Sequence, residues 1–182
     1  MERCFDPFPV LETERLRLRR IAMDDADDMF AMRHDPRMHT YTDTKPDETI
    51  DDTRTYIGKM NAGVDAGKWI IWAMEHKVTG RVIGSISIWN LNEERQSGEL
   101  GFGIVPSHQG QGLMREALQR VTGFGFQAMN LDILEAYTEQ GNLPSLKLLE
   151  RCGFSEVGRV DEEGTAGGRT YHMVIYRLTR SA

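Results

Sequence analysis

The stretch that decides the fold reads Glu99-Leu-Gly-Phe-Gly-Ile-Val-Pro-Ser-His-Gln-Gly-Gln-Gly-Leu-Met-Arg-Glu-Ala-Leu118. Its first part alternates, with Leu100, Phe102 and Ile104 separated by small or polar residues, which predicts a strand with one buried face. Two glycines then interrupt the pattern, and an apolar helical face follows them. The stretch therefore predicts a strand, a glycine-rich turn and the start of a helix.

A turn of this kind is suited to an anion. The first N–H groups of a helix have no partner within the helix, and the helix dipole places partial positive charge beside them. Gly110 and Gly112 let the backbone approach a ligand closely and adopt positive φ values. The turn therefore predicts a site for a phosphate or pyrophosphate group.

Three familiar phosphate-binding motifs do not fit this turn. A P-loop needs Gly-Lys-Ser/Thr after four spacer residues, and the chain has no such segment. A dinucleotide fingerprint needs a small residue three positions after its second glycine, where this chain has Arg115. A kinase glycine-rich loop needs lysine and aspartate motifs farther along the chain, and we find none. A plain strand-to-helix turn without a ligand remains open at this point.

A second motif lies farther along the chain, where Asn142 and Pro144 are followed by Ser145 and by the pair Gly153-Phe154. Asparagine is a good N-cap residue, proline is favoured in the first turn of a helix, and glycine commonly ends one. The segment therefore predicts a short helix that leads into another strand.

The rest of the chain predicts a mixed succession of strands and helices. A half-buried strand is expected at residues 11–21, then a helix that opens at Asp24 and a second helix over residues 47–62. Further strands are expected at residues 69–74, 82–89, 99–105, 131–139 and 169–178 and directly after Phe154. Further helices are expected from about Gly110 or Gly112 to residue 128 and over residues 144–152. The order is β-α-α-β-β-β-α-β-α-β-β. We expect an α/β (α+β) fold, with one domain over residues 1–182, a core at 11–178 and a mostly antiparallel twisted sheet flanked by helices.

Composition argues against several classes of function. The chain has 182 residues, 40% hydrophobic and 27% charged, as in folded domains, and its net charge of −6 argues against nonspecific nucleic-acid binding. No apolar run is long enough to span a membrane and no signal peptide is visible, so a cytoplasmic protein is expected. The cysteines and histidines show no metal-ligand spacing, so neither a metal site nor a disulfide is expected.

Two motifs together resemble the GNAT superfamily of acyl-CoA-dependent N-acetyltransferases. They are Gln109-Gly-Gln-Gly-Leu-Met-Arg-Glu-Ala-Leu118 and Asn142-x-x-Ser145 followed by Cys-Gly-Phe154. The opening Leu11-Glu-Thr-Glu-Arg-Leu-Arg-Leu-Arg19 is similar to the branch that contains ribosomal-protein N-terminal acetyltransferases. The resemblance extends from about residue 11 to residue 178, and the family's fold agrees with the order of elements predicted above.

The resemblance implies a role for each segment. The strand ending at Ile104-Val105 would separate from its neighbour and pair its backbone with the pantetheine arm of acetyl-CoA, the co-substrate. Asn142 would hydrogen-bond the pantetheine, Ser145 would lie near the thioester sulfur, and Glu99 would lie near the acceptor amine. The CoA pyrophosphate would be held by backbone amides of Gln109, Gly110, Gln111, Gly112, Leu113 and Met114.

The chain departs from the family pattern at one catalytic position. Many members have a tyrosine seven residues after the asparagine as general acid, where this chain has Leu149. The thiolate would then take a proton from Ser145 or from water, or leave without one. Glu99 would accept the proton of the amine, and backbone N–H groups such as that of Val105 would stabilise the oxyanion.

The identity of the acceptor remains open from sequence. It would be a primary amine, either a protein N-terminus or a small molecule such as a polyamine, an amino acid or an antibiotic. Residues 38–41 would help to form its pocket. The leucine at position 149 also permits a noncatalytic acyl-CoA-binding module. Neither a nucleic-acid nor a membrane partner is expected, and the chain would be a monomer or a homodimer.

Overall fold

The computed structural model describes residues 5–165 and 168–181. Its strands are β1 (Leu11–Glu12), β2 (Leu16–Arg19), β3 (Ile70–His76), β4 (Val82–Asn92), β5 (Ser97–Ile104), β6 (Ile133–Glu139), β7 (Ser155–Glu163) and β8 (Thr170–Thr179). Its α-helices are α1 (Ala26–His34), α2 (Ile50–Asp65), α3 (Leu113–Gln127) and α4 (Leu143–Arg151). Apart from the first strand, the elements follow the predicted order.

The strands form one sheet in the order β1-β2-β3-β4-β5-β6-β8-β7. The expected antiparallel meander is present as β3, β4 and β5, whereas β5 and β6 pair in parallel because α3 connects them as a crossover. Parallel strands end at the same edge of a sheet. The glycine-rich turn after β5 and the Asn142 segment after β6 therefore lie at one edge, although they are far apart in sequence.

The predicted first strand is divided into the two antiparallel strands β1 and β2, with Leu11 opposite Leu18. Thr13 forms the turn between them, because its hydroxyl accepts the Leu16 N–H at 2.9 Å and its own N–H donates to the Leu16 carbonyl at 2.9 Å. The same hydroxyl donates to the Glu116 carboxylate of α3 at 2.8 Å. A contact with a distant helix therefore stabilises a turn that alternation alone did not indicate.

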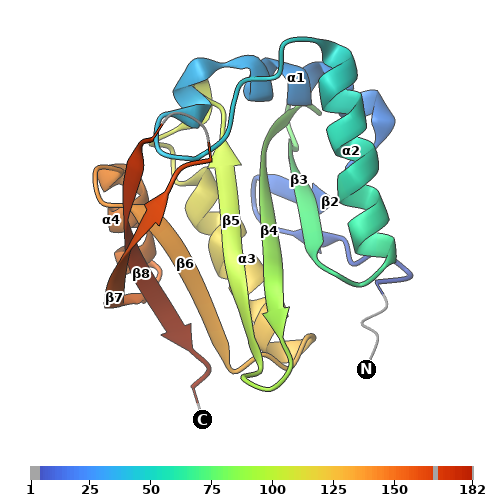
Figure 1. The fold of residues 1–182 in the computed structure, drawn as a ribbon. Helices are drawn as coiled ribbons and strands as arrows, with labels where there is room; N and C mark the ends of the chain where they lie inside the picture. Colours follow the sequence, from blue (N-terminus) through green and yellow to red (C-terminus); the bar gives the residue numbers. More distant parts are fainter. Residues whose placement is uncertain (1–4, 166–167, 182) are drawn as a thin grey trace.

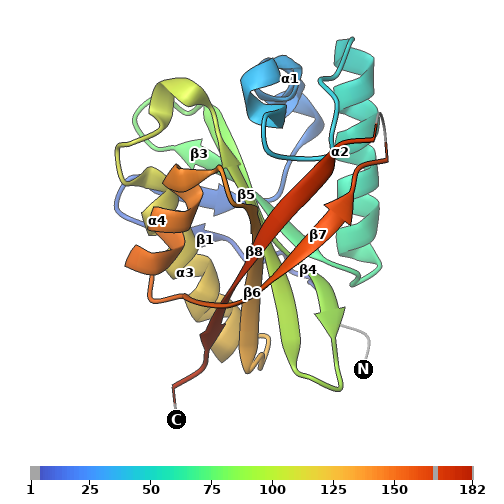
Figure 2. The same cartoon turned by 60° about the vertical axis from the view of Figure 1, so that its left-hand side comes forward.

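Helices cover the two faces of the sheet unequally. On one face, α3 and α4 pack on a core that contains Trp72, Leu118 and Leu149, all fully buried. On the other face, α1 and α2 bury Met29 and Ile57 against β3 and β4. Figures 1 and 2 show that these two helices lie over the β2–β4 half only. Over β5 and β6 this second face carries no α-helix from the described residues.

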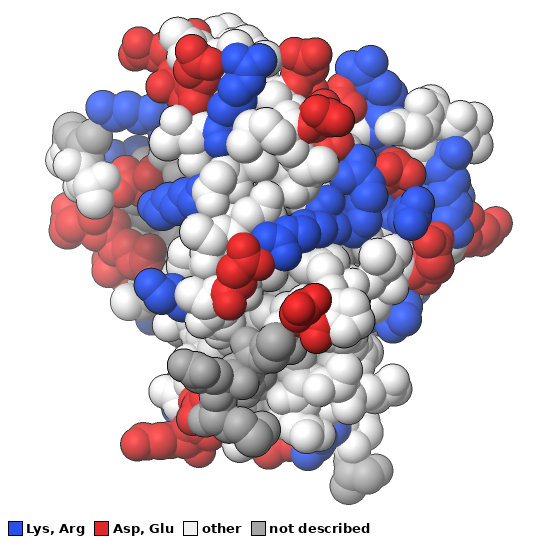
Figure 3. All heavy atoms as spheres, turned by 90° about the vertical axis from the view of Figure 1, so that its right-hand side faces the viewer, with Lys and Arg blue, Asp and Glu red and all other residues white. Residues whose placement is uncertain are grey.

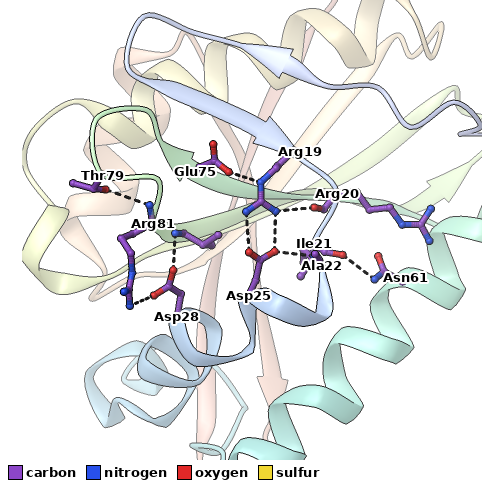
Figure 4. A network of polar contacts seen from close by, with 11 residues as sticks. Arg19, Arg20, Ile21, Ala22, Asp25, Asp28, Asn61, Glu75, Thr79 and Arg81 are labelled. Carbon is purple, nitrogen blue, oxygen red and sulfur yellow. Dashed lines mark hydrogen bonds and ion pairs between the residues drawn. The ribbon is translucent and has the colours of Figure 1, made fainter.

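A polar network fastens the N-terminal segment and the first two helices to the sheet (Figure 4). Arg19 donates through both Nη groups to Asp25 at 2.8 Å, and through Nε to Glu75 at 2.5 Å. Asp25 also accepts the Ala22 N–H at 2.7 Å. Burial by itself would raise the pKa of Asp25, but the hydrogen bonds from Arg19 and Ala22 hold it below its ordinary value of 3.8. The folded state therefore stabilises the ionised form of the Asp25 carboxylate.

We expect Asp25→Asn to destabilise the protein at pH 7 by about 2 kcal/mol, because Arg19 then loses one of its two charged partners in a mostly buried site and keeps only Glu75. A carboxyl group with a lowered pKa stabilises the fold above its unfolded-state pKa, and this contribution disappears as the pH falls through the folded-state pKa. The difference between the two proteins should therefore shrink below about pH 4. Urea unfolding at several pH values measures it.

The matched control for this prediction is Asp65→Asn. Asp65 pairs with Arg20 on the surface, where the Asp65 side chain is 62% exposed, and such pairs contribute little. If the difference in the free energy of unfolding between the wild type and Asp25→Asn stayed constant down to pH 2, the stabilising role of the ionised Asp25 carboxylate would be contradicted.

The surface on the side of α2 mixes the two signs of charge. Figure 3 shows acidic and basic side chains interspersed over this face, with several basic side chains adjoining one another near its centre. Ion pairs such as Arg54 with Asp51 account for part of this arrangement. Among the described helices, none combines the length and the apolar composition that crossing a membrane requires.

Candidate active site

The parallel pair β5–β6 opens toward the C-terminal ends of its strands. Its register ends with Glu99 opposite Glu135. The two strands nevertheless continue to Ile104 and Glu139. A gap therefore lies between them beyond Glu99, as expected for the strand that was predicted to separate from its neighbour.

The edge of β5 that faces this gap belongs to Ile104 rather than to Val105. The Val105 N–H donates to the carbonyl of Ile83 in β4 at 2.8 Å. Backbone groups point alternately to the two sides of a strand, so those of Ile104 point into the gap. The Gln109 side chain donates to the Ile104 carbonyl there at 3.1 Å. The prediction that the Val105 N–H stabilises an oxyanion is wrong, because β4 already binds that group.

The turn after β5 presents a row of backbone N–H groups. The N–H of Gln109 donates to the Pro106 carbonyl at 3.2 Å, and the N–H of Glu116 donates to the Gly112 carbonyl at 3.2 Å. Between them, the amides of residues 110–115 have no hydrogen-bond acceptor among the residues that the structure describes. The sequence had predicted that the row begins at Gln109. It begins at Gly110 instead, because the Gln109 N–H is already bonded within the turn.

Two glycines shape this row. Gly110 and Gly112 have φ values of 74° and 79°, and Gly112 is the N-cap of α3. Residues with side chains rarely adopt such values. A Cβ atom at Gly110 would meet nothing within 4 Å, so the space in front of the turn is open. Leu113 and Met114 bury their side chains in the core and offer only their N–H groups.

The start of α4 lies at the same edge. Asn142 is its N-cap, and the Oδ1 atom accepts the Ser145 N–H at 3.4 Å. This leaves the Asn142 Nδ2 group without an acceptor among the described residues. Ser145 is half-buried in the first turn. Leu149 is 0% exposed in the core behind the sheet, so its position provides no access to a bound substrate.

Glu99 lies on the face of the sheet that the helices leave open. It stands opposite Trp89 of β4 and Glu135 of β6, and its carboxylate accepts from the Asn90 Nδ2 group at 3.2 Å. Partial burial raises the pKa of Glu99, and the negative charges of Glu162 and Glu135 raise it further against the opposing hydrogen bond from Asn90. A carboxylate with a raised pKa is a stronger base, which suits proton abstraction.

Tyr137 is a neighbour of Glu99 that the sequence did not reveal. It lies two residues after Glu135 on β6, and alternate strand residues share a face. Burial raises the pKa of Tyr137, and the charges of Glu135 and Glu99 add to this effect. Its hydroxyl therefore keeps its proton at neutral pH. Glu135 also forms an ion pair with Arg177, whose Nη2 atom lies 2.6 Å from the carboxylate.

The segment between α1 and α2 crosses the top of the open face and contacts the β7–β8 hairpin (Figure 2). Asp43 accepts the hydroxyl and the N–H of Thr165 at 2.7 and 2.8 Å, and the Tyr171 hydroxyl donates to the Thr42 carbonyl at 3.3 Å. Nearby, the Met38 side chain lies over Gly103 of β5, 3.2 Å from the position of a Cβ atom. The region predicted around residues 38–41 therefore borders this face.

The strand, the turn and the helix described above match a known family. Residues 15–155 match the sequence model described as "Acetyltransferase (GNAT) domain", which covers more than half of the chain. The chain belongs to the GNAT acetyltransferase family.

Curated relatives and solved structures agree with this assignment. This GNAT protein is 30% identical over 170 residues, 93% of its length and 96% of the relative's, to "Uncharacterized N-acetyltransferase p20" of Bacillus licheniformis. Its fold is similar to ribosomal-protein-S5-alanine acetyltransferase from Vibrio fischeri, with a TM-score of 0.80, 20% identity and coverage of 94% and 96% of the two chains. It is also similar to spermidine N-acetyltransferase from Vibrio cholerae in complex with CoA and spermine, with a TM-score of 0.79, 23% identity and coverage of 92% and 96%.

Within the GNAT fold, the predicted residues lie in two places near the β5–β6 gap. The glycine-rich turn and the start of α4 lie at the edge where both strands end, and Glu99 lies on the open face. Among the described residues, no three His, Cys, Asp or Glu side chains gather as metal ligands.

Proposed function

We propose that this acetyltransferase moves the acetyl group of acetyl-CoA to a primary amine, and that this amine is a protein N-terminus. The observation that carries the proposed donor is the row of unbonded amides at residues 110–115 beside the open edge of β5. One feature is suited to phosphates and the other to an amide-rich chain, which together describe CoA.

The donor would bind along the edge of the sheet. The pyrophosphate would accept hydrogen bonds from the amides of Gly110, Gln111, Gly112, Leu113 and Met114. The pantetheine arm would pair with Ile104 in the gap, where the Gln109 side chain now bonds the strand. Asn142 would donate to the pantetheine through Nδ2. The thioester would then lie between the strands near Glu99, where their pairing ends.

Glu99 would act on the acceptor from the open face. An amine is protonated at neutral pH and becomes a nucleophile only when it loses a proton, which the Glu99 carboxylate would accept directly or through water. The amine nitrogen then attacks the thioester carbonyl, the C–N bond forms and the C–S bond breaks. Holding both substrates in one complex supplies much of the acceleration.

The departing thiolate needs a proton donor other than residue 149. Leu149 has no proton to give and lies in the core. We propose that Ser145 donates to the sulfur, since it is half-buried in the first turn of α4 beside Asn142. Its proton would be replaced from solvent.

A polyamine is the second candidate acceptor. Glu99 and Glu162 place negative charge at the open face, which attracts a cation with more than one amine. The two structural neighbours reported above are named for acetylating a ribosomal protein and spermidine, so both kinds of acceptor occur on this fold.

The experiment that tests the proposal is a thiol-release assay with acetyl-CoA. Peptides with different N-terminal residues, polyamines and aminoglycosides serve as acceptors, and the same peptides with blocked N-termini serve as controls. We expect free CoA thiol with an unblocked peptide, and mass spectrometry should place the acetyl group on its N-terminal amine. Turnover with polyamines alone would select the second candidate, and failure to bind CoA would overturn the donor.

A further inference from the structure

The turn between β1 and β2 is attached to the first turn of α3 through one carboxylate. Glu116 accepts from the Thr13 hydroxyl at 2.8 Å, from the Arg15 backbone N–H at 3.2 Å and from the Arg15 Nε atom at 2.5 Å. The Lys77 N–H also donates to the Arg15 carbonyl at 3.0 Å. These contacts fix the backbone of Arg15 and the inner edge of its guanidinium group.

The outer edge of this guanidinium lies at the glycine-rich turn. The Arg15 Nη2 atom is 3.3 Å from the position that a Cβ atom would take on Gly112. No residue in the described part of the chain accepts a hydrogen bond from either Nη group. The Arg15 side chain is 40% exposed, and that of Glu116 is 20% exposed. The unbonded Nη groups therefore belong to a partly exposed side chain that lies against the glycine-rich turn.

The geometry of arginine explains why one residue can serve both partners. A guanidinium group carries five N–H donors in a rigid plane, so it can bind a carboxylate through Nε and a phosphate through its Nη groups at the same time. Attachment of the β1–β2 turn to α3 would not by itself need the Arg15 guanidinium group, because the Thr13 hydroxyl and the Arg15 N–H already donate to Glu116.

We propose that Arg15 binds the pyrophosphate of the acyl donor together with the amides of residues 110–115, and that Glu116 is the residue that positions it. This inference rests on the proposed CoA donor. It adds a positively charged side chain from the N-terminal hairpin to a site that otherwise consists of backbone groups.

The test is equilibrium binding of CoA and of 3′-dephospho-CoA to four proteins: the wild type, Arg15→Met, Glu116→Gln and the double variant. Glu116→Gln retains an oxygen that accepts from Thr13 and from the Arg15 backbone, but it lacks the charge. The double variant leaves neither charge unpaired, so it controls for folding. Arg17→Met is the matched control on the same hairpin, since Arg17 pairs with Glu12 on the surface.

We expect Arg15→Met and the double variant to weaken the binding of both CoA forms about 30-fold, as loss of a charged hydrogen bond to phosphate implies. Glu116→Gln should weaken it much less, and Arg17→Met should leave it unchanged. The loss in the Arg15 variants should shrink as NaCl concentration rises, because salt screens the wild-type contact.

Three results would overturn the inference. Wild-type affinity in Arg15→Met would remove Arg15 from the site, and equal losses in Arg15→Met and Glu116→Gln would reduce the pair to an attachment of the hairpin. A loss for CoA but not for 3′-dephospho-CoA would exclude the pyrophosphate as the group bound. In each case the wild type still binds CoA, which separates these failures from a failure of the proposed donor.

Discussion

Gly112→Trp should abolish CoA binding, with an affinity at least about 1,000-fold below that of the wild type, as expected when several phosphate hydrogen bonds are lost together. Gly112 is the N-cap of α3 with φ at 79°, and a Cβ atom there would lie 3.3 Å from Arg15. An indole at this position would fill the approach to the unbonded amides and would force the turn out of its conformation. Isothermal titration with CoA measures the effect.

The matched control places the same side chain elsewhere. Gly58 lies exposed on α2, and a Cβ atom on it would meet nothing within 4 Å. We expect Gly58→Trp to bind CoA as the wild type does. Thermal unfolding of both variants shows whether they fold. A folded Gly112→Trp protein with unchanged affinity would refute the phosphate site at the turn.

Glu99→Gln should reduce turnover about 100-fold at neutral pH, the size expected from loss of a general base. Glutamine keeps an oxygen that accepts from Asn90, so the local hydrogen bond survives while the base is lost. The deficit should become smaller at high pH, where more of the amine is already deprotonated. The pH dependence of kcat/KM for the wild type and the variant measures it.

The direction of the pH dependence follows from the environment of Glu99. Burial, Glu162 and Glu135 raise its pKa, so the active carboxylate is lost as the pH falls through a value above that of an ordinary glutamate. The acidic limb of the wild-type profile should therefore lie above that ordinary value. Glu162→Gln removes one of the charges that raise the pKa and should move this limb to lower pH. Identical profiles for the wild type and Glu99→Gln would exclude Glu99 as the base.

Local sequence patterns identified the parts of the site. Alternation predicted the strand that ends at Ile104, the glycines predicted the turn, and Asn142 and Pro144 predicted the beginning of α4. These features depend on backbone preferences and on contacts between residues close in the chain, which is why a single sequence reveals them. The same patterns indicated the order of the elements, apart from the division of the first strand.

Other features depend on partners that the chain brings together only when it folds. The Val105 N–H is unavailable because the register with β4 directs it to Ile83, and periodicity does not determine register between strands. Leu149 is enclosed by the core on the α3–α4 side of the sheet, so this position supplies no general acid in place of the tyrosine that many family members have.

The sequence by itself determined the strand–turn–helix segment, because that segment depends on local geometry and residue type. It also determined the family through its motifs, and the resemblance to that family pointed to Glu99 as a candidate base. Only the tertiary structure decided the direction in which the pKa of Glu99 is shifted and the position in which Arg15 is held. The charges that raise the pKa of Glu99 come from β6 and β7, and the carboxylate that holds Arg15 comes from α3. Electrostatic interactions depend on distance in space, and the sequence alone does not specify that distance between residues far apart in the chain.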